Sequence, residues 1–166
     1  TVIMLWQGLH IRYIRTLLKS AVNEVVDEIK KLQQENGVNL RNIIVDEDGV
    51  GGGVKDYLRC QGFTNNARAL KGENYQNLKT QCYYKLADQI NKGQIGVSCS
   101  DVNIKNYITE ELEQVRTKDA DKDNKLQIIP KDTVKAILGR SPDYADALAM
   151  RMYYEIDSNF GKYYVQ

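Results

Sequence analysis

The stretch Ile43-Ile44-Val45-Asp46-Glu47-Asp48-Gly49-Val50-Gly51-Gly52-Gly53 joins a short apolar run to three consecutive acids and a cluster of glycines. An apolar run bounded by turn residues is typical of a buried strand. The glycines favour a sharp turn, here into a helix expected over 54–60. Ligands of α/β folds gather at the carboxyl ends of strands. The pattern therefore places Asp46 at a strand tip, where a ligand-binding carboxylate is expected.

A structural interpretation of the same segment stays open. Asp48-Gly49 is a common turn pair, and Asp46 could simply cap the turn through an Asx turn. Nucleotide-binding loops fit poorly, because the glycines lack the full dinucleotide-binding spacing and no Gly-Lys-Ser/Thr follows.

A second acidic segment, Ser141-Pro142-Asp143-Tyr144-Ala145-Asp146-Ala147-Leu148, opens the last predicted helix. Serine as N-cap and proline at the first helical position are a strong start signal. Asp143 would then lie in the first turn, where the helix dipole alone favours an acid.

Asp146 lies further along this helix, where the dipole gives less benefit. On a helical wheel it points away from the solvent face marked by Arg151 and Glu155, among alanine, methionine and tyrosine positions. A carboxylate there is costly unless it is paired or metal-bound. Metal binding is the preferred interpretation of Asp146, and an ion pair with Arg140 is the alternative.

Hydrophobic periodicity and turn residues predict alternating strands and helices along the chain. The predicted elements are a hairpin of 1–6 with 10–14, a helix over 20–35, a strand over 42–45, a helix over 54–60, a strand over 68–70, helices over 75–92 and 102–113, a hairpin of 114–117 with 125–129, and a helix over 142–156. This order predicts an α/β fold with a mixed β-sheet flanked by helices. Residues 1–166 are expected to form a single domain, and the pattern leaves open whether 157–166 is a flexible tail.

Composition excludes several classes of protein. The chain has 166 residues, of which 42% are hydrophobic and 27% charged, as in globular domains. Lys+Arg number 23 against 22 Asp+Glu, so net charge gives no argument for nucleic acid. Three cysteines without CxxC spacing favour neither a disulfide framework nor a zinc site and suggest a reducing cytoplasm. No apolar run is long enough to span a bilayer, so no membrane partner is expected.

Weaker signals receive structural interpretations. Residues 119–124 imitate the start of a calcium loop, but Asn124 stands where glycine belongs, so a solvated hairpin tip is favoured. His10, the single histidine, is not expected to be catalytic. Lys131 could contact DNA phosphates, although an ordinary surface lysine is favoured, and Lys79 is expected on a solvated helix flank.

Together, the stretch from Ile43 to Val54 and the stretch Gly139 to Leu148 resemble the carboxy-terminal nuclease domain of phage terminase large subunits. Those DNA-packaging enzymes have an RNase H-like fold. Residues 65–70 and 73–79 are similar to the region that connects the two segments in such proteins. The order of elements agrees too, so the resemblance covers nearly the whole chain.

The resemblance implies a metal-dependent endonuclease that cuts concatemeric double-stranded DNA during phage genome packaging in the host cytoplasm. By position, Asp46 and Asp146 match the catalytic acids, and Asp143 matches an auxiliary metal-binding position. These residues would hold Mg²⁺ or Mn²⁺, with two ions in an intact site. The implied partners are double-stranded DNA and, in the full protein, the terminase small subunit and the portal.

One departure from the family pattern matters. The family supplies a further aspartate from a first strand, just before the strand that matches Thr1 to Trp6. That strand is absent here, so the domain is expected to be N-terminally incomplete, with the remaining acid ahead of Thr1. Two alternatives stay open: a non-catalytic DNA-binding or assembly module of the same fold, and another RNase H-like nuclease of the resolvase or RNase H type.

Overall fold

The computed structural model describes residues 1–48, 50–119 and 124–157. Short 3₁₀ turns lie at Leu40–Asn42 and Leu70–Gly72. The strands are β1 (Val2–Gln7), β2 (His10–Thr16), β3 (Ile44–Asp46), β4 (Gln61–Phe63), β5 (Gly96–Val97), β6 (Thr117–Lys118) and β7 (Gln127–Ile128). The helices are α1 (Val22–Asn36), α2 (Val50–Leu58), α3 (Leu78–Asn91), α4 (Val102–Gln114), α5 (Lys131–Leu138), α6 (Asp143–Arg151) and α7 (Tyr153–Ile156).

The strands form three small sheets. β1 pairs antiparallel with β2, and β2 pairs parallel with β5. β3 and β4 form a separate parallel pair, and β6 and β7 an antiparallel one. The α/β class with parallel and antiparallel pairing is as expected, but β1 and β3 belong to different sheets.

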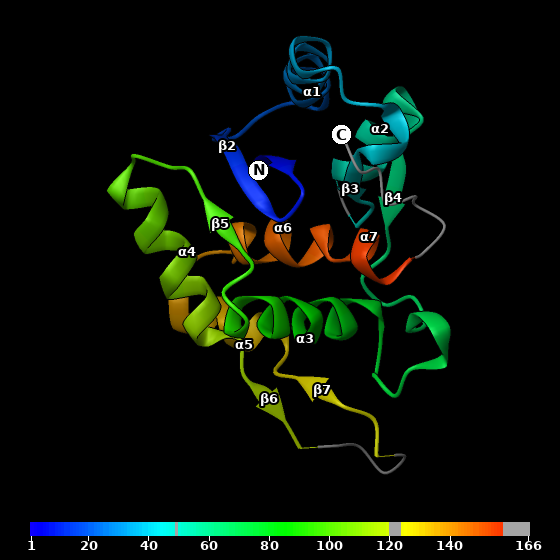
Figure 1. Cartoon of the computed structure of the whole chain (residues 1–166), viewed down its shortest axis with the longest axis vertical. Helices are drawn as coiled ribbons and strands as arrows, with labels where there is room; N and C mark the ends of the chain where they lie inside the picture. The colour runs from blue at the N-terminus through cyan, green and yellow to red at the C-terminus, as the bar shows by residue number, and fades with distance from the viewer. Residues whose placement is uncertain (49, 120–123, 158–166) are drawn as a thin grey trace.

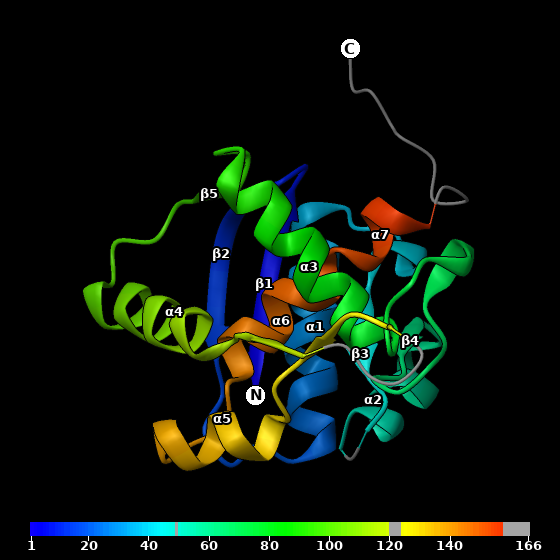
Figure 2. The same cartoon turned by 90° about the horizontal axis from the view of Figure 1, so that it is seen from below.

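Helices cover both sides of these strands. Figure 1 shows α1 and α2 on one side, and α6 between the β1–β2 hairpin and α3 on the other. Figure 2 shows α4 and α5 at the side of the β1–β2 hairpin and α6. The buried apolar residues form two clusters, one around α3, α6 and β2 and the other between α1 and α2. β1 and β3 thus lie between the two apolar clusters.

Locally encoded elements agree with the prediction. The first hairpin, the helix α1 and the long helix α3 lie where periodicity placed them, within one to three residues at their ends. Gly37 ends α1 with a φ of 62°, a left-handed conformation that glycine adopts without steric cost. The predictions of the first hairpin, α1 and α3 are therefore confirmed.

Other predictions were wrong in detail. Residues 68–70 do not form a strand, because the chain turns into the 3₁₀ segment Leu70–Gly72. The helix α2 begins at Val50, so three glycines predicted to form a turn are helical. The last helix starts at Asp143 with Pro142 as its N-cap, so Ser141 is not the cap, and the helix breaks at Met152.

Some elements were not predicted at all. Strands β4 and β5 are only three and two residues long, and α5 directly follows Pro130. Within the described residues, no helix is long and apolar enough to cross a membrane.

Candidate active site at the carboxyl end of β3

Asp46 ends β3, as predicted, and its side chain is held by two donors. Its Oδ1 accepts hydrogen bonds from the backbone N–H of Asp48 at 3.0 Å and from Nδ2 of Asn65 at 2.9 Å. The first bond is the Asx turn that the sequence left open. Burial raises the pKa of Asp46, while the Asp48 backbone bond acts to lower it. The Asx turn therefore engages the same carboxylate that the sequence predicts to bind a ligand.

The glycines after Asp46 allow close packing of α2 against β3. A Cβ at Gly51 would overlap the backbone carbonyl oxygen of Asp46. A Cβ at Gly62 of β4 would overlap the side chain of Glu47. Glu47 is itself engaged, because it pairs with Lys55 and accepts a hydrogen bond from Thr64 Oγ1 at 2.7 Å. Gly51 thus permits the close approach of two backbones, and Gly62 makes room for the Glu47 side chain.

Asp146 lies on the buried side of α6, as the helical wheel predicted, with a side chain only 12% exposed. Two lysines converge on it: Lys79 of α3 lies 2.7 Å from Oδ1, and Lys131 of α5 lies 2.5 Å from Oδ2. Tyr83 donates its hydroxyl to Oδ1 at 2.7 Å. Arg140, the ion-pair partner considered from the sequence, instead pairs with Glu111 and Glu110.

These contacts shift three pKa values. Burial alone would raise the pKa of Asp146, but the adjacent lysines outweigh it and lower the pKa. Burial acts to lower the pKa of Lys131, but the Asp146 carboxylate holds it above its ordinary value. Burial and the neighbouring carboxylate raise the pKa of Tyr83 well above its usual range. Asp146 is thus an ionised acid between two ammonium groups.

The start of α6 is fixed by a second buried acid. Glu111 of α4 is fully buried, accepts the backbone N–H of Ala145 at 2.8 Å, and pairs with Arg140. This bond satisfies one of the free N–H groups of the first helical turn. Asp143, one turn before Asp146, has a side chain 43% exposed and lies 3.4 Å from the amino nitrogen of Thr1.

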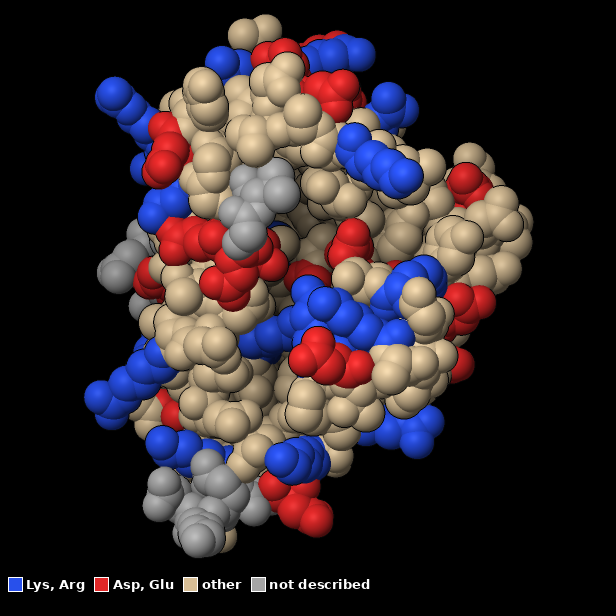
Figure 3. Space-filling view, turned by 180° about the vertical axis from the view of Figure 1, so that it is seen from behind, with Lys and Arg blue, Asp and Glu red and all other residues tan. Residues whose placement is uncertain are grey.

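The acids of both segments meet at one cavity. Asp46, Asp48, Asp143 and Asp146 all line it, together with Lys131. The Asp46 and Asp146 carboxylates are close enough for mutual repulsion to raise the pKa of Asp46. Figure 3 shows, on the face opposite that of Figure 1, acidic and basic side chains facing one another around a hollow. The fold therefore brings together the three acids singled out from the sequence.

The donor set suits a hard divalent cation in its chemistry, because carboxylate oxygens are the ligands that Mg²⁺ and Mn²⁺ prefer. The two ammonium groups on Asp146 show that positive charge already collects at this carboxylate. Among the described residues, however, no group of three or more acids, histidines or cysteines is arranged to hold a metal by itself.

The fold is that of an RNase H-like α/β domain. Three solved structures similar to this chain are nuclease domains of phage terminases. The manganese-containing nuclease domain of the large terminase subunit gp2 of bacterial virus Sf6, a lysine-to-alanine mutant, matches with a TM-score of 0.74 and 23% identity, over 87% of this chain and 79% of that one. The same domain without the substitution matches at 0.71 and 24%, over 87% and 78%. The large terminase nuclease from thermophilic phage G20c matches at 0.55 and 16%, over 88% and 69%.

No protein-family model and no curated protein matches the sequence. The chain accordingly has the fold of terminase nuclease domains, as the two acidic segments led us to expect.

Sequence reasoning missed the partners of the acids. Lys79 and Tyr83 lie at i,i+4 spacing on α3, which places them on one helix face and could have signalled a shared target. Lys131 was predicted to be an ordinary surface lysine, and Lys79 part of a solvated flank; both were wrong, because each pairs with Asp146. His10 bonds to Ser98 Oγ at 2.7 Å, away from the acids that line the cavity. Residues 120–123 and 158–166, in the calcium-like run and the tail, lie outside the described residues.

Proposed function

We propose that this chain is the nuclease domain of a terminase large subunit, a metal-dependent endonuclease that cuts concatemeric double-stranded DNA during phage packaging in the host cytoplasm. The observation that carries the proposal is the convergence of Asp46 and Asp146 on one cavity, in a fold shared with solved terminase nuclease domains. One of those structures contains manganese.

Asp46 and Asp146 would hold Mg²⁺ or Mn²⁺, with Asp143 as an auxiliary ligand, and two ions would complete the site. The ions would activate water and stabilise the charge that develops on the phosphodiester. Asn65 fixes the orientation of Asp46, and Tyr83 fixes that of Asp146, by direct hydrogen bonds. Both carboxylates are thereby held in place before DNA arrives.

The two lysines neutralise Asp146 and lie where a DNA phosphate would approach. The Lys79 side chain is 16% exposed and that of Lys131 is 34% exposed, so Lys131 has more freedom to turn toward the backbone of DNA. Contacts of this kind are made to the phosphodiester backbone and carry no sequence information. We therefore propose that cutting shows little sequence preference. We also propose that the full protein contacts the small subunit and the portal.

A second candidate is a non-catalytic DNA-binding or assembly module of the same fold. The pairing of both Asp146 oxygens with lysines favours it, as does the lack of a three-acid cluster among the described residues. Under this candidate the lysines and acids would serve stability, and DNA would bind without being cut.

Nicking of supercoiled plasmid separates the two candidates. The chain, and a version extended by an acid-bearing strand ahead of Thr1, would be incubated with Mn²⁺, Mg²⁺ or a chelator. We expect metal-dependent nicking that Asp146→Asn and Asp46→Asn abolish and that Asp132→Asn leaves intact, because the Asp132 side chain is 96% exposed. Metal-independent nicking, undiminished nicking by Asp146→Asn, or no nicking by either version would refute the nuclease proposal.

A further inference from the structure

The helix α6, which carries Asp143 and Asp146, has no side-chain cap of its own. Pro142 is its N-cap residue and makes no capping hydrogen bond. The first N–H groups of a helix have no partner within the helix and need one from elsewhere. Glu111 of α4 provides it, because its Oε2 accepts the N–H of Ala145 at 2.8 Å. The cap of α6 thus comes from another helix and acts on the residue directly before Asp146.

Glu111 is itself held by a chain of contacts. Its side chain is fully buried, and its Oε1 pairs with Arg140. The guanidinium carbon of Arg140 lies 4.4 Å from the ring centre of Tyr107, which is one turn before Glu111 on α4. The Tyr107 ring is stacked on that of Tyr144 in α6, with the centres 5.8 Å apart. We call these four residues, Glu111, Arg140, Tyr107 and Tyr144, the α6 clamp.

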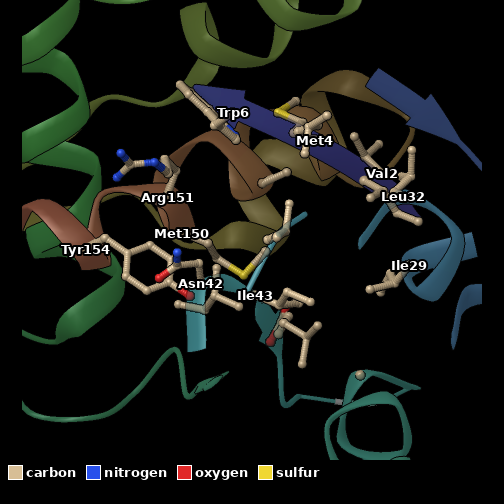
Figure 4. A pocket seen from close by; sticks show the side chains of 18 of the residues that line it. Val2, Met4, Trp6, Ile29, Leu32, Asn42, Ile43, Met150, Arg151 and Tyr154 are labelled. Atoms are coloured by element: carbon tan, nitrogen blue, oxygen red, sulfur yellow. The ribbon is translucent and has the colours of Figure 1, made fainter. Parts of the chain in front are cut away.

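The other end of α6 is held by a separate set of contacts. Arg151 donates from Nη2 to the carbonyl oxygen of Gly8, in the turn between β1 and β2, at 2.8 Å. Figure 4 shows Arg151 between Trp6 of β1 and Tyr154 of α7. The centres of these two rings lie 5.7 and 5.8 Å from its guanidinium carbon. Because both ends are held, α6 cannot turn about its axis without breaking contacts at one of them.

The position of Asp146 depends on that rotation. A side chain on a helix points in a direction set by the rotation of the helix about its axis. Three groups meet the Asp146 carboxylate at 2.5 to 2.7 Å, namely the ammonium groups of Lys79 and Lys131 and the hydroxyl of Tyr83. Hydrogen bonds weaken steeply when their length or angle departs from the preferred range. A small turn of α6 would therefore break these contacts.

We propose that Glu111 is a positioning residue for Asp146. Through the α6 clamp it fixes the first turn of α6, and with it the carboxylate that the proposed nuclease uses to hold a metal ion. Glu111 is not one of the described residues that line the cavity, so it acts through α6 and not by contact with DNA or metal. The catalytic role rests on the proposed function, whereas the positioning is a property of the metal-free protein.

The hydroxyl proton of Tyr83 reports on the position of Asp146 without metal or DNA. This hydroxyl is bonded to Asp146 Oδ1, and the Tyr83 side chain is buried, with 5% exposure. Its exchange with water would be measured by proton NMR on the whole chain with a chelator present. We expect Glu111→Ala to speed this exchange by about tenfold or more, because Asp146 leaves the hydroxyl. Glu111→Gln keeps an oxygen for the Ala145 N–H and should stay within about twofold of wild type.

Two controls separate positioning from a general loss of stability. Val26→Ala removes buried side-chain atoms from the cluster between α1 and α2, and Glu110→Ala removes only the exposed partner of Arg140. Neither should speed the exchange of the Tyr83 hydroxyl. Unchanged exchange in Glu111→Ala, or an equal increase in Val26→Ala, would overturn the proposal. If Glu111→Ala does not fold, Glu111→Asp, which keeps the charge but has a shorter reach, must speed the exchange in the same way.

Plasmid nicking tests the catalytic consequence separately. In the version of the protein that nicks, Glu111→Ala should lower kcat by about tenfold or more and leave KM for plasmid nearly unchanged, because a misplaced catalytic group slows the reaction more than it weakens DNA binding. Glu110→Ala should keep both constants. If no version nicks, the proposed function fails, and the Tyr83 exchange rates still decide whether Glu111 positions Asp146. Faster exchange in Glu111→Ala with an unchanged kcat would overturn the catalytic role.

Discussion

Removing the charge of Asp146 tests the electrostatics of the site directly. In Asp146→Asn the side chain keeps its size, but Lys79 and Lys131 lose their shared counter-ion. The local charge of these three groups rises from +1 to +2. At an effective dielectric constant of 20, each contact at about 2.7 Å corresponds to roughly 6 kcal/mol of attraction before desolvation is subtracted.

The net cost is smaller than this attraction. Removing one partner of a buried ion pair typically costs about 3–5 kcal/mol. The Lys131 side chain is 34% exposed and can turn into water, so we take the lower end and expect about 3 kcal/mol. For a domain of this size that corresponds to a fall in Tm of about 6–12 °C.

Urea and thermal unfolding in the presence of a chelator would measure this loss. Asp143→Asn is the matched control, because its side chain is 43% exposed and its contact with Thr1 is 3.4 Å. The control should change stability by less than about 1 kcal/mol. An Asp146→Asn protein as stable as the wild type, or more stable, would refute the claim that the two lysines depend on this carboxylate.

Three further predictions concern Gly51, Asp146 and Glu111. Gly51→Ala should destabilise the protein by about 2 kcal/mol or more in urea unfolding, because its Cβ overlaps the Asp46 carbonyl oxygen. Gly52→Ala should stay within about 1 kcal/mol of wild type, because its Cβ would lie 3.4 Å from its nearest neighbour. The folded-state pKa of Asp146 is lowered, so its stabilising effect is complete above the unfolded pKa near 4 and is lost as the pH falls through the folded value. The stability difference between wild type and Asp146→Asn should accordingly shrink below about pH 4, and a constant difference down to pH 2 would contradict this. Glu111→Gln should cost less than about 2 kcal/mol in the same assay, because burial raises the pKa of Glu111 and Arg140 keeps its pairing with Glu110, and a loss above about 3 kcal/mol would contradict this.

The sequence predicted what local patterns encode. The apolar stripe and terminal glycine of α1, and the position of Asp146 on the inner face of its helix, depend only on residues within a few turns. Strands β4 and β5 have no such signal. They are three and two residues long and exist because β3 and β2 provide a neighbouring backbone.

The partners of the site residues were also harder to predict, because they are distant in sequence. Asp46 and Asp146 could be chosen as candidates, but the lysines and tyrosine around Asp146 come from α3 and α5, far away in sequence. The glycines of α2 show a related difficulty. Glycines disfavour helices, so the sequence suggested a turn. Gly51 is nevertheless helical, because α2 lies so close to the Asp46 carbonyl oxygen that only a residue without a Cβ fits there.

The opposite pKa shifts of Asp46 and Asp146 show that the surroundings of the two carboxylates differ. Neutral donors hold Asp46, so burial dominates and raises its pKa; cations hold Asp146, so attraction dominates and lowers its pKa. With both acids and both lysines ionised, the cluster of Asp46, Asp146, Lys79 and Lys131 has no net charge. A divalent cation bound among these four groups would add two positive charges within a few ångströms of two ammonium groups. If these groups bind a divalent cation, as proposed, binding would be coupled to displacement of a lysine or to the arrival of further negative charge, such as a carboxylate or a DNA phosphate.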